Sequence, residues 1–165
     1  MRIATITVLA LLAGCAQEPT PAEREAATQQ DIAAVEQANS APPPMREVTP
    51  EAIGYPDMER HGMMGRSCSY APGTSLGARV IARAEDAFMK IGGEVVRLGA
   101  DSGAAMLPAN TRSRYIGGAY ELQLELAGSG EPTAGDKRDY DGTLILRDQY
   151  GRIVYQGSGI AQCDG

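Results

Sequence analysis

His61 is the only histidine of the chain, so a catalytic site that needs an imidazole base must be built around it. Cys68 follows one strand-length later and is the nucleophile that could be paired with it. Catalysis by this pair would require a free thiol, whereas Cys163 offers Cys68 a disulfide partner. We therefore expect no catalytic residues and a protein that is not an enzyme.

The segment from Met58 to Met64 has a second interpretation, because it holds three methionines and His61 within seven residues. Thioether and imidazole groups favour Cu(I), so Met58, His61, Met63 and Met64 are candidate ligands of a periplasmic copper site. The alternative is that Met63 and Met64 pack against the core where the chain enters its first strand. Packing is the favoured interpretation, so we expect no metal and no other cofactor, with copper binding as an alternative.

Acidic residues form two further groups. Three aspartates before Gly142 resemble a calcium loop, but the alignment puts Lys137 at the first ligand position and Asp148 where a bidentate Glu belongs. A solvated turn is therefore favoured over weak calcium binding. Glu121 and Glu125 could act as paired carboxylates. The strict alternation of apolar and polar residues around them instead predicts the solvated face of a strand, with arginines of neighbouring strands as partners.

The first fourteen residues have the composition of a targeting segment. Arg2 gives a positive start, and the run from Ile3 to Ala13 is apolar apart from its threonines. This run is too short for a helix that crosses a bilayer core about 30 Å thick, but it has the length of a signal-peptide core. It ends in Leu12-Ala13-Gly14-Cys15.

This tetrapeptide resembles the lipobox of bacterial lipoproteins. The resemblance implies that residues 1–14 are removed as a signal peptide and that Cys15 becomes the first residue, carrying diacylglycerol and further fatty-acyl (palmitate) groups. The alternative is an uncleaved anchor with an incidental cysteine. In the family, an Asp after the cysteine tends to retain the protein in the inner membrane. Ala16 therefore implies a cell-envelope protein, lipid-anchored at the outer membrane and facing the periplasm.

Two cysteines remain after Cys15, and in an exported protein this even number predicts one disulfide between Cys68 and Cys163. Two separate buried thiols are the alternative. The bridge would close a loop of about 95 residues, worth about 4–5 kcal/mol in the chain-entropy model. It would also pin a C-terminal strand that otherwise frays.

Residues 15–52 are predicted to form an acidic stalk rich in Ala and Pro, with seven acids and two bases. Thr20-Pro21-Ala22-Glu23 has the form of a helix start with a capping box, and the helix is expected to reach about Ala38, with Asn39 as its stop. Its apolar stripe is thin, which favours a solvated helical or disordered spacer over a partner-binding helix. Three prolines, 42–44, then form a short stiff segment.

Residues 53–165 hold fourteen acids and twelve bases, which is too balanced to predict nucleic-acid binding. Short runs punctuated by turns predict a mainly β domain, a small antiparallel barrel or sandwich of about seven to eight strands. A polar stretch from Gly128 to Asp136 is expected to be a mobile loop. Short helical turns are expected near residues 49–51 and 56–59. The expected strands are 66–70, 78–84, 87–91, 94–98, 113–116, 120–126, 140–147 and 153–162.

Six tyrosines lie in or beside these strands, and they are expected to be half-buried unless several gather outward as a recognition surface. They are Tyr70, Tyr115, Tyr120, Tyr140, Tyr150 and Tyr155.

The C-terminal domain is similar to small uncharacterised lipoproteins of Gram-negative bacteria. The similarity lies in residues 65–70 (Gly-Arg-Ser-Cys-Ser-Tyr), 89–94 (Met-Lys-Ile-Gly-Gly-Glu) and the ending 157–163 (Gly-Ser-Gly-Ile-Ala-Gln-Cys). A second resemblance is to the membrane-bound inhibitors of c-type lysozyme, through Ser113-Arg114-Tyr115 to Tyr120. The Trp-Lys-Gly element usual in those inhibitors is absent here.

The sequence as a whole predicts a non-enzymatic binding or envelope-support protein. Its expected contacts are the membrane, through the N-terminal lipid, and a periplasmic protein or cell-wall partner, with no nucleic acid. A lysozyme-inhibitor-like protein is the first alternative, and copper binding through the Met/His segment is the second.

Overall fold

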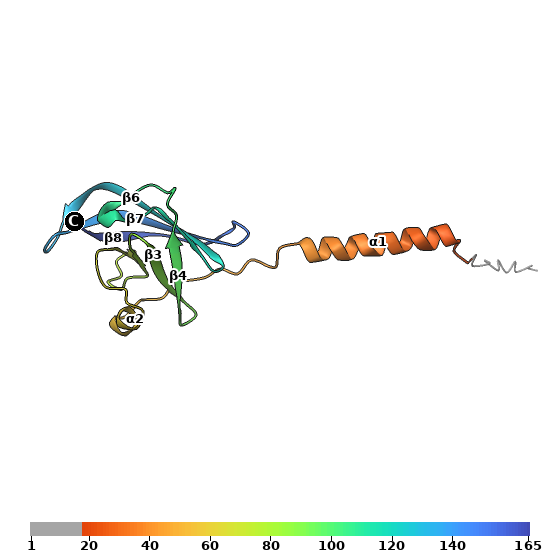
Figure 1. The fold of residues 1–165 in the computed structure, drawn as a ribbon, viewed down its shortest axis with the longest axis horizontal. Helices are drawn as coiled ribbons and strands as arrows, with labels where there is room; N and C mark the ends of the chain where they lie inside the picture. The colour runs from red at the N-terminus through yellow and green to blue at the C-terminus, as the bar shows by residue number, and fades with distance from the viewer. Residues whose placement is uncertain (1–17) are drawn as a thin grey trace, which may run out of the picture. The chain divides into compact units, whose positions relative to one another are not determined.

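The computed structural model describes residues 18–165, so the lipobox and Cys15 lie outside the described residues (Figure 1). The chain divides into two compact units, residues 1–42 and 43–165. No helix in the described range is both long and apolar enough to cross a membrane.

Helix α1 (Pro21–Ser40) is the described element of the first unit. Thr20 accepts a hydrogen bond from the Glu23 backbone N–H, the Glu23 carboxylate accepts one from the Thr20 N–H, and Pro21 takes the first helical position. The predicted helix start is therefore confirmed. The helix ends at Ser40 rather than near Ala38, because Asn39 is accommodated in its last turn. None of its residues is buried.

The second unit is a closed barrel in which each strand is antiparallel to the next and the last pairs with the first (Figure 1). This is an up-and-down topology. The predicted mainly β domain is confirmed, and of its two predicted forms, barrel or sandwich, the structure is the barrel. The strands are β1 (Cys68–Pro72), β2 (Val80–Ala82), β3 (Asp86–Ile91), β4 (Glu94–Ala100), β5 (Arg114–Gly117), β6 (Tyr120–Pro132), β7 (Lys137–Asp148) and β8 (Ile153–Asp164). Two short helices, α2 (Tyr55–Arg60) and η1 (Pro108–Asn110), accompany them.

One predicted loop is largely strand. The stretch from Gly128 to Asp136 was expected to be a mobile loop, yet β6 continues to Pro132 after an irregularity in register between Ala127 and Glu131. Gly130 makes this possible, because its φ is 76° and a Cβ there would lie 2.5 Å from a ring carbon of Tyr140. The glycines that suggested a loop are therefore the residues that allow the strand to bend.

The barrel interior is filled by aliphatic and tyrosine side chains. Leu122 pairs with Leu146, and Leu124 with Leu144, and all four are fully buried. Tyrosines supply the bulk in a chain with one Phe and no Trp. Tyr70 and Tyr115 are fully buried, and Tyr120, Tyr140 and Tyr155 pack against the same core.

Residues that precede the first strand also belong to the barrel unit. The Val48 N–H donates to the Val154 carbonyl, and the Ile53 N–H donates to the Ala78 carbonyl. Glu51 pairs with Lys90 as a β-bridge, so no helical turn forms at residues 49–51. These backbone bonds explain why the unit begins at residue 43, ten residues before the change in composition.

The predicted disulfide is confirmed. Cys68 on β1 lies directly opposite Cys163 on β8, and the two are bridged across 95 residues of sequence. The bond therefore joins the first strand of the barrel to the last.

We predict that removing this bridge destabilises the barrel by about 4 kcal/mol, because the unfolded chain loses a constraint on a long loop. Urea denaturation of Cys68→Ala/Cys163→Ala against the native protein measures the loss. Reduced native protein is the matched control, since it lacks the bond but keeps both buried sulfur atoms. An unchanged midpoint on reduction, or a free thiol on either cysteine by mass spectrometry, would contradict the prediction.

Candidate functional site

The outer face of β6, β7 and β8 carries a hollow of about 550 Å³. Two of its lining residues, Gly142 and Gly159, are glycines at positions that face the inside of the barrel. A Cβ at Gly159 would collide with the carbonyl oxygen of Ala71, and one at Gly142 would lie 3.1 Å from the Cβ of Ala161. The backbones of β7, β8 and β1 therefore approach closely inside the barrel. The inner face therefore has no room for a side chain at either glycine.

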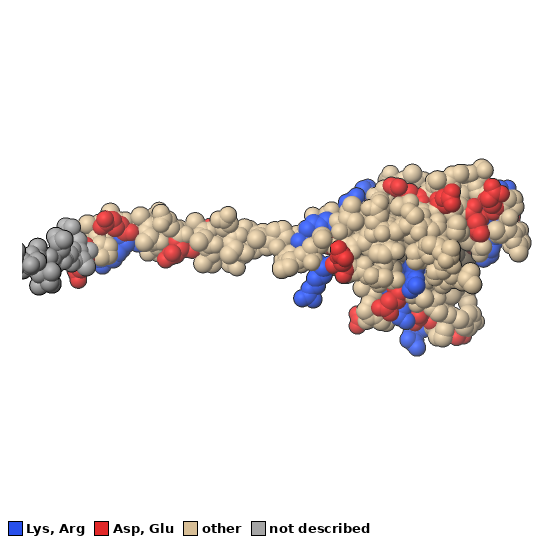
Figure 2. Space-filling view, turned by 180° about the vertical axis from the view of Figure 1, so that it is seen from behind, with Lys and Arg blue, Asp and Glu red and all other residues tan. Residues whose placement is uncertain are grey.

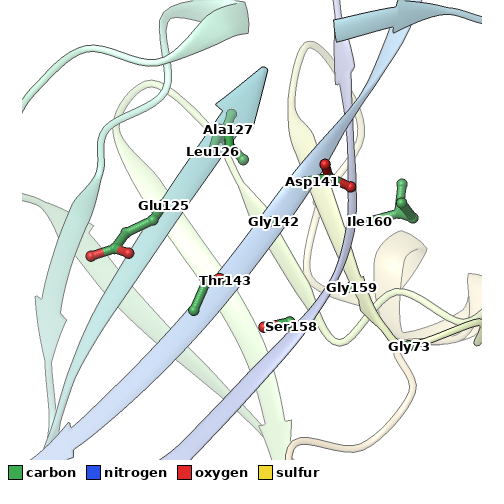
Figure 3. A pocket seen from close by; sticks show the side chains of 10 residues that line it. All are labelled: Gly73, Glu125, Leu126, Ala127, Asp141, Gly142, Thr143, Ser158, Gly159 and Ile160. Atoms are coloured by element: carbon green, nitrogen blue, oxygen red, sulfur yellow. The ribbon is translucent and has the colours of Figure 1, made fainter. Parts of the chain in front are cut away.

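Two rows of outward side chains line the hollow, as the strand register requires. Glu125, Thr143 and Ser158 form one row across β6, β7 and β8, and Asp141 and Ile160 belong to the next row. Figure 3 shows Thr143 and Ser158 between Glu125 on one side and Asp141 with Ile160 on the other. The hollow thus combines two carboxylates, two hydroxyls and an aliphatic side chain.

A second hollow adjoins the first and shares Gly73 and Ile160 with it. It adds Leu76, whose side chain is fully exposed, and Asp139, whose carboxylate accepts a hydrogen bond from the Gln162 amide at 2.9 Å. We call the two hollows together the outer groove. No Lys or Arg is among the residues that line it.

The charge of the outer groove is not neutralised within the described part of the chain. Neither Glu125 nor Asp141 makes an ion pair there. Glu125 accepts a hydrogen bond from the Gln123 amide, which leaves its charge in place. Figure 2 shows Asp and Glu side chains along the top of the barrel, the side on which Figure 1 labels β6, with Lys and Arg side chains toward the ends of this row.

Glu121, the other member of the predicted carboxylate pair, differs from Glu125. It lies 4.0 Å from Arg147 on β7, one of the arginine partners expected from the sequence. The two glutamates share a face, as the alternation predicts, but only Glu125 lines the groove.

The Met/His segment is divided by the fold. Met63 is buried with Ile53, Ile81 and Phe88 in a second cluster outside the barrel, and Met58 packs against the same cluster. Met64 and His61 are exposed. The packing interpretation is therefore correct for Met63 and wrong for Met64. Met63 is therefore committed to a core, whereas Met64 and His61 are open to solvent.

The stretch that resembles lysozyme inhibitors is mostly committed to the barrel. Tyr115 is fully buried, and its hydroxyl donates to the Arg83 carbonyl at 2.7 Å and accepts from the Arg112 N–H at 2.7 Å. Arg114 pairs with Asp101. Tyr115 therefore has no surface to insert into a cleft.

A charged cluster that the sequence analysis missed lies at the β2–β3 turn. Asp86 is 2% exposed and accepts hydrogen bonds from Arg83 at 2.7 Å and from Arg97 at 2.8 Å. Both guanidinium groups also lie near the Phe88 ring, at 5.0 and 5.9 Å from its centroid. Arg83 further donates to the Gly62 carbonyl, so the cluster ties the segment after α2 to the barrel. The spacing Arg83-x-x-Asp86 was the available signal.

The cluster controls the pKa of its carboxyl group. Burial raises the pKa of Asp86, but the hydrogen bonds from Arg83 and Arg97 outweigh burial and hold the pKa below its usual value. Asp86 is therefore ionised at neutral pH and serves the structure, because its oxygens are occupied by arginines rather than aimed at the groove.

No family model, curated protein or solved structure matches the chain. The candidate site therefore stands on its geometry alone.

We predict that Asp86→Asn destabilises the protein by about 2 kcal/mol at neutral pH, because two charge-assisted hydrogen-bonded pairs are lost. A carboxyl group with a depressed pKa stabilises the fold above its unfolded-state pKa of about 3.9, and this stabilisation disappears as pH falls through the folded-state pKa. The native protein should therefore lose more stability than the variant between about pH 5 and pH 3. Asp101→Asn, at a more exposed pair with Arg114, is the control and should change the unfolding midpoint less. Equal effects of the two substitutions would refute the prediction.

Proposed function

We propose that this protein is an outer-membrane-anchored periplasmic lipoprotein whose barrel is a non-enzymatic binding module, and that its partner docks in the outer groove. The observation that carries the proposal is the unneutralised, partly apolar groove on the outside of a closed barrel. The interior of the barrel is occupied by its own leucines and tyrosines. Binding at the outer surface therefore requires no rearrangement of the core.

The N-terminal part of the chain supports the anchored arrangement. The lipobox resemblance at residues 12–15 supplies the anchor, and α1 supplies length, since twenty helical residues span about 30 Å. A helix without any buried residue suits a solvated spacer better than a packed element. The proposed order is lipid at Cys15, spacer, then binding domain.

We expect Cys15→Ser to abolish incorporation of labelled palmitate and to release the protein from the membrane fraction, because acylation of this thiol is the proposed anchor. Ala16→Ser is the matched control and should leave both properties unchanged. Ala16→Asp should move the labelled protein from the outer-membrane to the inner-membrane fraction on a density gradient. Labelling that survives in Cys15→Ser would rule out the proposed anchor.

Docking in the groove is tested by placing a photo-crosslinking amino acid at Thr143 or Ser158 of the full-length protein in cells. Both side chains line the hollow, so irradiation should yield a defined adduct from each position. Ile145 and Gln156 are the matched controls, because they lie one outward row away on the same strands and outside the groove. Absence of adducts from the groove positions, or equal adducts from the controls, would defeat the proposal.

A further inference from the structure

We propose that the occupant of the outer groove is an extended protein segment that carries Lys or Arg side chains beside an apolar one. This inference rests on the proposed binding function and adds the chemistry of the partner. Its starting point is the apolar part of the groove, where Ile160 is 41% exposed and Leu76 is fully exposed. Covering these side chains removes apolar surface from water, which favours docking.

The sign of the charge selects the partner. Glu125, Asp139 and Asp141 line the groove, and no base lines it. Nucleic acids and anionic lipid headgroups are repelled by such a surface, and so is the same face of a second copy of this chain. A protein segment bearing ammonium or guanidinium groups is attracted by the same three carboxylates that repel nucleic acids, anionic lipids and a second copy of the groove.

The shape of the groove favours an extended chain over a helix. The groove crosses β6, β7 and β8 toward the loop after β1, and strands lie about 4.8 Å apart. Its carboxylates lie on the adjacent strands β6 (Glu125) and β7 (Asp139 and Asp141). Its apolar residues follow, on β8 and in the loop between β1 and β2. Side chains on one face of an extended peptide recur about every 7 Å. Such a peptide can place two successive cationic side chains against the carboxylates of β6 and β7 and then an apolar side chain against Ile160 on β8.

The peptide Lys-Ser-Lys-Ser-Leu, labelled with a fluorophore and titrated with the mature chain carrying Cys15→Ser, tests this proposal. Binding should exceed that of Glu-Ser-Glu-Ser-Leu by at least tenfold. It should also weaken as salt rises from about 0.05 M to about 0.5 M, since the pairs formed are exposed. Equal affinity for the two peptides would overturn the inference.

Substitutions then locate the binding. Glu125→Gln/Asp141→Asn should weaken binding of the lysine peptide roughly tenfold, because two charges facing the peptide are lost. Glu59→Gln/Glu94→Gln removes the same net charge at positions outside the groove and should leave the affinity unchanged. Leu76→Ser/Ile160→Thr should weaken binding without changing its salt dependence. Thermal unfolding of each variant establishes that the barrel is intact, and equal losses in the groove and control pairs would refute the site.

The outcomes separate this inference from the proposed function. Crosslinks from Thr143 and Ser158 with no preference for the lysine peptide would leave the binding function standing and reject its cationic occupant. Adducts of this chain with itself, accompanied by dimers in analytical ultracentrifugation, would show that the occupant of the groove is a second copy of the chain and would reject the basic segment. Mass spectrometry of an adduct from the native groove should identify a partner segment that contains Lys or Arg.

Discussion

Five residue pairs join β1 to β8. The other seven strand pairings would form an open sheet, and the pairing of β1 with β8 closes that sheet into a barrel. The disulfide lies at one end of the ladder, where Cys68 faces Cys163, and Gly159 against Pro72 lies at the other. Closure removes the exposed sheet edges that would otherwise pair with other chains. It also places Ala71 opposite Ile160 and lets the Gly73 N–H donate to the Ser158 carbonyl, and Gly73 and Ile160 line both hollows of the outer groove.

The tyrosines inside the barrel make this closure more important. Tyr70 is fully buried, and its hydroxyl makes no hydrogen bond to any described residue. Burial, and then the neighbouring Tyr155 hydroxyl, raise the pKa of Tyr70 above its usual range, so the ring stays neutral. Taking this hydroxyl out of water costs free energy, which offsets part of what the ring contributes. A covalent link across the first and last strands compensates for such a core.

Features set by neighbouring residues were predictable from the sequence, and features set by distant ones were not. The capping box at Thr20 and Glu23 and the approximate positions of all eight strands follow from local patterns. The choice between barrel and sandwich stayed open in the sequence, because it depends on β1 meeting β8, and local patterns do not encode that contact. The groove was not predictable, because alternation gives the outward residues but not which of them, from strands distant in sequence, surround a hollow.

The inward glycines determine how the groove can discriminate between partners. Gly142 and Gly159 are held by contacts inside the barrel, so the floor of the groove is fixed before any partner arrives. A fixed floor lowers the ordering cost of binding on this side of the interface, and the partner segment then bears most of it. Many apolar side chains can pack against Ile160 and Leu76, whereas Glu125 and Asp141 favour only positively charged groups. Selectivity therefore resides in the carboxylates, and affinity in the apolar surface that they flank.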